Sequence, residues 1–485
     1  MIRQLLNICF IFLVATSYAQ NKQLVYNFDQ LPQTLMTNPG AIVDYNYHVG
    51  VHFLSGLFLQ VGATNKNVTY NNVFAGESSA GGILRNLNNI NDLTTNDYFQ
   101  FNERMEILYG GIRLRNKKNY LSFGMYQEME GFSLYPEDLV KIYYHGDDRN
   151  GDGIPEFDRV TDLNQISLIG NLMGVLHIGI SSKISERLNI GARFKLISGS
   201  LNINTTNNNG NYQLGFSEPS SLYEHNFRNM DVIFNSSGLL ISETGEFIGD
   251  TGSYLGGLFF LDGNIGMGID LGFTYQATEK VYVTASLLDL DFINYSNEVT
   301  SYVVVNDFLL EDTNYFDPPE GGEQQYWKDK IDEYRFLYGD ELPLDTIHVG
   351  YNNFRSPILN ASAAYVMNNK TKGEKSVFRG VKCDKCLSGK EVLTSEIGIQ
   401  TYTIFWPDKI GWALTAFYSR EFNRYINAKI TYTYDNFSPY NIGLGVSTHY
   451  QRFNFYATLD NLLYLHRLKD SSYQSFQVGF NFIFE

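Results

Sequence analysis

Long stretches of the chain alternate strictly between apolar residues and small or polar residues. In residues 265–275 the odd positions are Ile, Met, Ile, Leu, Phe and Tyr, whereas the even positions are Gly, Asp or Thr. The same alternation fills residues 476–484. Further alternating runs lie at residues 49–61, 188–196, 281–289, 426–434, 442–450 and 453–459. Because successive side chains of a strand point to opposite faces, each run predicts a β-strand with one apolar wall.

The length and content of these runs favour a transmembrane barrel over a soluble β-sandwich. Many are about 9–11 residues long, which is enough to cross a bilayer at a tilt. Their polar wall is rich in Gly, Asn, Thr and Ser, and aromatic residues such as Tyr275 and Tyr450 lie at strand ends, where membrane interfaces would lie. In lipid, only a closed barrel pairs every backbone group of its strands. We therefore predict an all-β, antiparallel transmembrane β-barrel of about 14 strands, within two either way.

The first residues predict export from the cytoplasm. Arg3 and an apolar run from Leu5 to Ala15 precede Ser17-Tyr18-Ala19, whose small residues match a signal-peptidase site. The run is too short to span a bilayer, so we expect a cleaved signal peptide rather than an anchor. Together with the barrel, this predicts a protein of the cell outer membrane with lipid as its first partner. The expected organisation is a signal peptide at 1–19, an N-terminal segment at 20–45 and a barrel at 46–485.

Connection lengths predict how the barrel is oriented. Tight polar turns, which outer-membrane barrels keep on the periplasmic side, lie at residues 185–187, 277–280, 420–424 and 451–452. Long loops are expected as insertions at residues 127–166, 197–253 and 294–344. Residues 202–211 are rich in Asn and Thr and predict a loop. Residues 323–338 predict a short amphipathic helix, because Trp327, Ile331, Tyr334 and Tyr338 would share one face.

Composition excludes two classes of protein. Only 18% of residues are charged and 15% are aromatic, so the chain can bury enough apolar surface to fold. This excludes a disordered protein. The formal net charge of −16 argues against a nucleic-acid binder, because phosphate contacts need a basic face.

One acidic stretch matches the first half of a calcium-binding loop. Oxygen ligands at alternate positions, with Gly153 at the sixth, suit the sharp turn of such a loop. The twelfth position is Arg159, so the usual bidentate carboxylate is missing unless a nearby Asp replaces it. The alternative is a solvated acidic turn without a metal. The candidate calcium ligands are Asp148, Asn150, Asp152, Ile154 (through its carbonyl), Glu156 and Asp158.

Two cysteines remain once the signal peptide is removed. Cys383 and Cys386 form a C-x-x-C motif, which could be a redox motif or half of a zinc site. A structural zinc site needs four ligands, and the sequence has no second pair of cysteines. Outside the cytoplasm we favour a local disulfide between Cys383 and Cys386.

Catalytic motifs are missing from the sequence. It contains no G-x-S-x-G, no H-E-x-x-H and no glycine-rich phosphate loop. His48 and His52 are four residues apart in an expected strand and would share a face, which suits a lumen or interface position better than a metal site. We expect no enzyme activity.

Three short motifs resemble those of a known family. They are Leu-Met-Thr-Asn-Pro-Gly-Ala at 35–41, Leu-Leu-Asp-Leu-Asp-Phe-Ile at 287–293 and Asp-Asn-Leu-Leu at 460–463. Together they resemble a family of Bacteroidota outer-membrane barrels of unknown function, and more distantly the PorP/SprF-type barrels associated with type IX secretion and gliding. The resemblance implies fold and location, and it brings no catalytic residues. The insertion at 127–166 and the Cys-containing loop depart from the family pattern.

Two functions fit these expectations. The first is a scaffold or accessory subunit of an envelope complex, linked to type IX secretion or gliding, whose aromatic loops would contact protein partners. The alternative is an uptake channel for a small hydrophobic or polar solute. A channel should carry charged rings in its lumen, whereas the inward walls consist mostly of Gly, Asn, Ser and Thr, which favours a filled barrel. The sequence therefore favours the scaffold.

Overall fold

The structure of this protein is a computed structural model. It describes residues 23–65, 94, 97–134, 137–148, 152–157, 159–164, 166–218, 220–238, 256, 258–259, 263–319, 322–339, 344–368, 394–407, 409–423 and 425–484. In this part of the chain, no helix is long and apolar enough to cross a membrane.

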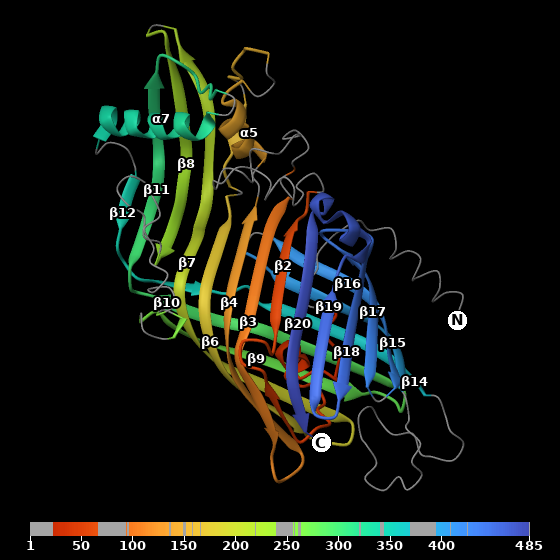
Figure 1. The fold of residues 1–485 in the computed structure, drawn as a ribbon. Coiled ribbons are helices and arrows are strands. Elements are labelled where there is room, and N and C mark those ends of the chain that lie inside the picture. The colour runs from red at the N-terminus through yellow and green to blue at the C-terminus, as the bar shows by residue number, and fades with distance from the viewer. Residues whose placement is uncertain are drawn as a thin grey trace, which may run out of the picture.

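Fourteen antiparallel strands close into a barrel (Figure 1), which confirms the predicted fold class. Closure follows from the last strand, β20, which pairs both with β1 (Tyr47–Gly50) and with β2. β1 and β2 lie one after the other along the same line of the barrel wall. Likewise, β13 (Tyr351–Phe354) and β14 lie one after the other, and both pair with β10. The fourteen strands are β2 (Leu57–Ala63), β3 (Tyr98–Arg113), β4 (Asn119–Leu134), β6 (Leu168–Lys183), β7 (Leu188–Ser217), β9 (Ile265–Gln276), β10 (Val281–Tyr295), β14 (Ile358–Asn368), β15 (Thr394–Phe405), β16 (Ile410–Asn423), β17 (Ile426–Asp435), β18 (Asn441–Tyr450), β19 (Phe453–Leu459) and β20 (Tyr473–Phe484).

The apolar wall of each strand faces outward. In β9 the side chains of Met267 and Leu271 are 47% and 43% exposed, whereas Asp270 between them is fully buried. In β20 Phe482 is exposed and Asn481 is buried. Exposed apolar side chains on the outside of a closed barrel match a lipid-facing belt, as in outer-membrane barrels.

One side of the barrel continues into a projecting sheet. β7 is 30 residues long, and its second half leaves the barrel wall to pair with β8 (Leu222–Ser237) and β5 (Val160–Asp162). β11 (Val299–Asp312) and β12 (Leu344–Ile347) extend this sheet, and α7 (Glu323–Tyr338) lies across its strands (Figure 1). α5 (Glu137–His145) lies beside them.

The projecting sheet corrects part of the loop prediction. Residues 202–211 form part of β7 instead of a loop, and they pair with β8 on either side of a bulge. Asn207 and Asn208 have positive φ there, a conformation that Asn adopts more readily than most residues. The insertions at 197–253 and 294–344 likewise contain strands. The predicted helix at 323–338 is confirmed as α7.

The tight turns lie together at the end of the barrel opposite the projecting sheet (Figure 1). They connect β6 to β7, β9 to β10, β16 to β17 and β18 to β19. Because outer-membrane barrels keep their short turns in the periplasm, we expect the projecting sheet to lie on the extracellular side.

The first barrel strand is interrupted. Residues 49–61 predict one strand, but the chain leaves the ladder after Gly50 and rejoins it at Leu57. Phe53 has a positive φ of 60° in this interruption, and its neighbour His52 is exposed. His48 points into the lumen, where its Nδ1 lies 2.6 Å from the hydroxyl of Tyr120. The expectation that His48 and His52 share a face is therefore wrong, because the interruption changes the strand parity between them.

The N-terminal segment fills the lumen. Residues 23–45, which include the short helix α2 (Thr34–Thr37), are largely buried against the inward side chains of the barrel. Lys429 Nζ donates to the carbonyl oxygens of Gln23 and Tyr26, at 3.1 and 2.5 Å. Gln33 Nε2 donates to the carbonyl oxygen of Ser55 at 2.8 Å. These contacts hold the segment inside the barrel as a plug.

Candidate functional site

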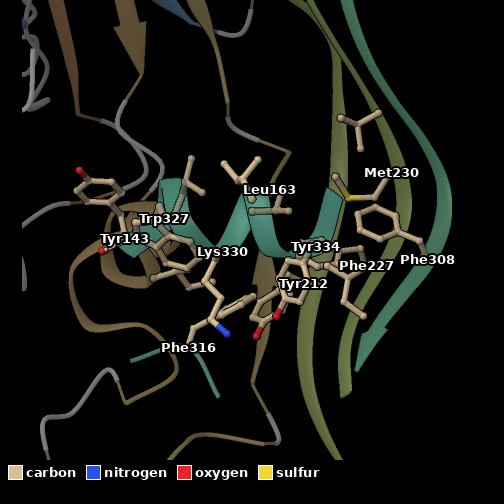
Figure 2. Close-up of a pocket in the computed structure, with 15 residues that line it drawn as sticks. Tyr143, Leu163, Tyr212, Phe227, Met230, Phe308, Phe316, Trp327, Lys330 and Tyr334 are labelled. Atoms are coloured by element: carbon tan, nitrogen blue, oxygen red, sulfur yellow. Dashed lines mark hydrogen bonds between the residues drawn. The ribbon is translucent and has the colours of Figure 1, made fainter. Parts of the chain in front are cut away.

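An apolar pocket lies on the projecting sheet (Figure 2), between the strands and the elements that cover them. Its floor comes from β7, β8 and β11, and its cover comes from α5, α7 and the segment at Phe316. The cavity volume is about 470 Å³. The lining residues are Leu139, Ile142, Tyr143, Leu163, Tyr212, Phe227, Met230, Val304, Phe308, Leu310, Phe316, Trp327, Lys330, Ile331 and Tyr334.

Helix α7 is held over the pocket by hydrogen bonds from residues on its apolar face. Trp327 Nε1 donates to the carbonyl oxygen of Tyr143 in α5, at 2.9 Å. One turn before the end of the helix, the Tyr334 hydroxyl donates to Asp312 Oδ2 at 3.0 Å. The sequence placed Trp327, Ile331 and Tyr334 on one helix face, and all three line the pocket. This part of the site was visible in the helical spacing.

Aromatic rings form much of the pocket wall. Phe227 and Phe308 stack across neighbouring strands, with ring centroids 4.5 Å apart and an interplanar angle of 8°. Phe316 meets Trp327 edge-to-face at 5.0 Å. Such ring pairs add a modest stabilisation beyond their buried area, so the wall is both apolar and fixed in shape.

A buried polar cluster lies behind the pocket lining at Tyr212. The Tyr212 hydroxyl lies 2.9 Å from Asp147 Oδ1 and 2.9 Å from His225 Nδ1. Asp147 Oδ2 also accepts a hydrogen bond from the backbone N–H of Phe316, at 3.0 Å. The ring of His225 stacks on Phe316 at 3.8 Å. Burial lowers the pKa of His225 to about 4, so the imidazole is neutral at physiological pH.

The pocket has one charged lining residue among the fifteen described above, and this charge is paired. Lys330 Nζ lies 2.5 Å from Asp312 Oδ2 and 3.0 Å from Glu333 Oε2. The walls of the pocket are therefore apolar, and the charge of its one lining cation is neutralised by neighbouring carboxylates.

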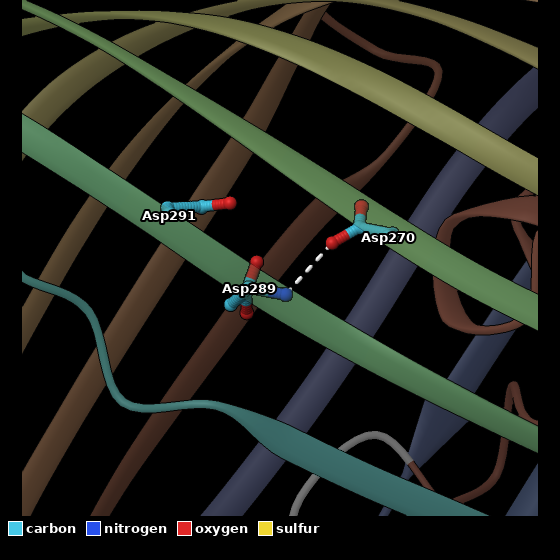
Figure 3. Close-up of side chains that lie close together, drawn as sticks. All are labelled: Asp270, Asp289 and Asp291. Atoms are coloured by element: carbon cyan, nitrogen blue, oxygen red, sulfur yellow. Dashed lines mark hydrogen bonds between the residues drawn. The ribbon is translucent and has the colours of Figure 1, made fainter.

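A second cluster, of buried ions, lies inside the barrel. Lys195 Nζ is within 2.9 Å of Asp270, 2.6 Å of Asp289 and 2.7 Å of Asp291. Figure 3 shows the three carboxyl groups together, with the hydrogen bond from the Asp289 backbone N–H to Asp270 Oδ1 at 2.7 Å. Carboxylate oxygens from all three lie close enough to share a metal ion, but the ammonium group of Lys195 is already the cation among them.

Arginines extend the lumen cluster across the barrel. Arg355 reaches four carboxylates, and its closest contact is 2.8 Å to Glu130. Arg104 pairs with Glu128 at 2.7 Å. Arg193 pairs with Asp270 at 2.5 Å. The expectation that the inward wall consists mostly of Gly, Asn, Ser and Thr therefore missed these ions. The sequence could have revealed them, because charged residues such as Arg193 and Asp270 stand at inward-facing positions of alternating runs.

The candidate calcium loop is described only in part. Asp148 accepts hydrogen bonds from the backbone N–H groups of Asp152 and Gly153, at 3.1 and 2.8 Å. Asp152 Oδ1 accepts from the N–H of Ile154, at 2.9 Å. Glu156 Oε2 lies 3.6 Å from the Arg159 guanidinium.

Several predicted residues lie outside the described part of the chain. Asn150 and Asp158 are among them, so calcium binding stays a prediction. Cys383 and Cys386 also lie there, as does the signal peptide at 1–19. The disulfide and the cleavage are likewise predictions.

Comparison with known proteins identifies the family. The model of the family of unknown function DUF5723 matches residues 39–460, so the chain belongs to this family. This confirms the resemblance to a barrel family of unknown function. No curated protein matches the sequence.

Similar solved structures include two toluene transporters and a FadL homologue. The toluene transporter TbuX of Ralstonia pickettii is 9% identical, with 94% of this chain and 95% of that chain covered and a TM-score of 0.39. A FadL homologue of Pseudomonas aeruginosa is 9% identical, with 97% and 100% covered and a TM-score of 0.41. The toluene transporter TodX of Pseudomonas putida is 9% identical, with 97% and 94% covered and a TM-score of 0.33.

Proposed function

We propose that this DUF5723 protein is an outer-membrane uptake protein that captures a small apolar solute in the pocket of its extracellular sheet. The observation that carries the proposal is the pocket itself, about 470 Å³ in volume and walled by aromatic and aliphatic side chains. Ligand sites usually measure roughly 300–1,000 Å³ and are lined mainly by such residues. An apolar solute that enters it leaves water, which provides the driving force for capture. The uptake alternative is thus better supported than the scaffold.

Passage through the barrel would require the plug to shift. Residues 23–45 occupy the lumen, and hydrogen bonds such as those from Lys429 and Gln33 hold them there. Each hydrogen bond contributes only roughly 0.5–1.5 kcal/mol, but the segment also buries apolar side chains such as Phe28 and Leu31, so the proposal requires that many of these contacts be exchanged together. In this proposal the protein binds and transports a solute and performs no catalytic step.

Binding is tested with a matched pair of substitutions on β11. Val304 lines the pocket, whereas its neighbour Val305 does not. Val304→Phe should fill part of the cavity and weaken the binding of N-phenyl-1-naphthylamine, an uncharged aromatic dye, by at least tenfold. Val305→Phe adds the same ring outside the pocket and should leave the affinity unchanged. Equal affinity for both variants and the unchanged protein would remove the pocket from the proposal.

Uptake is tested in cells that carry the protein. Cells with the unchanged protein should accumulate radiolabelled naphthalene faster than cells without it, and Val304→Phe should remove most of the difference. Equal accumulation with and without the protein would contradict a role in uptake, even if the pocket binds the dye.

The accessory role in an envelope complex is a second candidate. It is supported by apolar side chains on the outer side of α7, where Phe336 is 88% and Leu337 is 58% exposed. A photo-crosslinker at position 336 should capture a component of the type IX secretion or gliding machinery in native membranes. Absence of such a product would leave uptake as the better proposal.

A further inference from the structure

We infer that the extracellular pocket selects uncharged aromatic solutes and rejects anionic amphiphiles, and that the Lys330–Asp312 ion pair sets this selectivity. The inference rests on the proposed function, because it names the class of solute for the same pocket. Volume does not decide between the two classes, since about 470 Å³ accommodates either a fused-ring compound or a short acyl chain. Charge at the wall of the pocket decides it.

The single lining cation is already satisfied. Asp312 Oδ2 lies 2.5 Å from Lys330 Nζ, and their side chains are only 7% and 14% exposed. Glu333 adds a second carboxylate at 3.0 Å from the same ammonium group. With both carboxylates this close, the ammonium group is already neutralised and offers no free positive charge to an anion. An entering carboxylate or sulfonate would therefore have to displace Asp312 or stay unpaired in an apolar cavity.

Other contacts hold Asp312 in this position. Its Oδ2 also accepts a hydrogen bond from the Tyr334 hydroxyl at 3.0 Å, and its Oδ1 accepts one from the Asn314 backbone N–H at 3.1 Å. Burial alone would raise the pKa of Asp312, but these hydrogen bonds and Lys330 hold it below its ordinary value. Burial alone would lower the pKa of Lys330, but Asp312 and Glu333 raise it. Both partners therefore stay charged at neutral pH, and the pair persists.

The rest of the wall favours aromatic solutes. Phe227, Phe308, Phe316 and Trp327 present ring faces and edges to the cavity, and Met230 adds a polarizable sulfur. Aromatic rings gain from offset or edge-to-face contact with such walls, beyond the area that they bury. An uncharged aromatic solute therefore matches both the charge and the shape of the pocket.

The test uses two dyes that differ in one charged group. N-phenyl-1-naphthylamine is uncharged, and 8-anilinonaphthalene-1-sulfonate carries the same rings with a sulfonate. Energy transfer from Trp327 to the bound dye reports binding at the pocket, in the full chain in which Trp406 and Trp412 are replaced by Phe. This protein should bind the uncharged dye at least tenfold more tightly than the sulfonate.

Asp312→Asn should release Lys330 from its buried partner and raise the affinity for the sulfonate at least tenfold. Its affinity for the uncharged dye should change less than threefold, which also shows that the variant is folded. Asp332→Asn is the matched control, because it removes the same charge from an exposed position of α7. It should leave both affinities unchanged.

The outcomes separate this inference from the proposed function. If the unchanged protein binds neither dye at Trp327, the proposed function fails. If it binds both dyes equally well, the pocket stands but its selectivity is refuted. If Asp332→Asn gains as much sulfonate binding as Asp312→Asn, net charge rather than the ion pair controls access, and the inference is overturned.

Discussion

Lys195 shows what strand parity predicts about a single residue and what it leaves open. Its place on the polar wall of an alternating run predicts that it faces the lumen. The carboxylates that contact Lys195 come from two other strands. The register of β7 with β9, for example, aligns Lys195 with Gly268, close to Asp270. Registers between strands far apart in the sequence follow from closure of the whole barrel. The sequence could therefore place the lysine inside, but it could not predict the three-carboxylate cluster.

Removal of the Lys195 charge should destabilise the barrel. Lys195→Met would remove the cation that contacts Asp270, Asp289 and Asp291 together and, among the described residues, would leave only Arg193 and Arg355 beside them. Breaking a buried ion pair on one side costs about 3–5 kcal/mol. We expect the barrel of this variant to unfold at a lower temperature, measured as the temperature at which it loses the gel migration of the folded form. Lys183→Met is the control, since Lys183 is exposed and pairs with exposed Glu186, and it should migrate like the unchanged protein. Equal melting of both variants would mean that the cluster adds no stability.

The neutral His225 should make the pocket sensitive to acid. Burial lowers its pKa from 6.5 to about 4, although a backbone hydrogen bond at Asn314 and the charge of Asp312 partly raise it, while Lys330 lowers it. The unfolded chain takes up a proton below about pH 6.5, whereas the folded chain does so only near pH 4. Stability of the projecting sheet should therefore fall as pH falls through this window, by about 2 kcal/mol between about pH 7.5 and pH 5.

Urea unfolding followed by Trp327 fluorescence measures this effect at the two pH values. His225→Phe keeps an aromatic ring against Phe316 but cannot titrate, so its stability should depend less on pH. The carboxyl of Asp312 contributes little here, because its lowered pKa places its titration below this window. An equal slope in both proteins would assign the pH dependence to other groups.

At the scale of elements, the sequence predicted membrane strands better than the projecting sheet. Lipid on one side and a lumen on the other impose strict alternation, as in residues 265–275. Outside the membrane no lipid imposes that pattern, so the Asn-rich half of β7 resembled a loop. The helix at 323–338 was predictable because its apolar face covers the sheet. The interruption after Gly50 was not predictable, since residues 49–61 alternate well enough to predict one strand.

The terminal strand β20 gives a direct test of the lipid-facing wall. Phe480 and Phe482 both belong to its outward face, and Phe482 is 41% exposed. Replacing both by Lys should prevent assembly, because a Lys facing lipid costs about 2–4 kcal/mol at the midplane of the bilayer. The protein should then be lost from the outer-membrane fraction. Phe336→Lys, on the exposed side of α7, should assemble normally, and normal assembly of the double variant would contradict the assigned face.

At the scale of the whole molecule, the proposed function gives different roles to the two ends of the barrel. The end that we expect to be extracellular carries the projecting sheet with its apolar pocket, and the lumen of the barrel holds the plug and the buried ions. In the proposed function, a solute that is captured outside therefore meets a closed barrel, so that capture and passage would be separate steps. This separation requires the pocket to face the medium and the tight turns to face the periplasm.

Labelling of intact cells tests this orientation. In a chain with Cys383 and Cys386 replaced by Ser, a cysteine at exposed Lys328 of α7 should react with a maleimide that does not cross membranes. A cysteine at Glu186, in the tight turn between β6 and β7, should react only after the outer membrane is permeabilised, although its side chain is 91% exposed. The contrast depends on the side of the membrane, because both positions are accessible in the isolated protein. If the turn cysteine reacts first on intact cells, the pocket faces the periplasm and cannot capture a solute from outside.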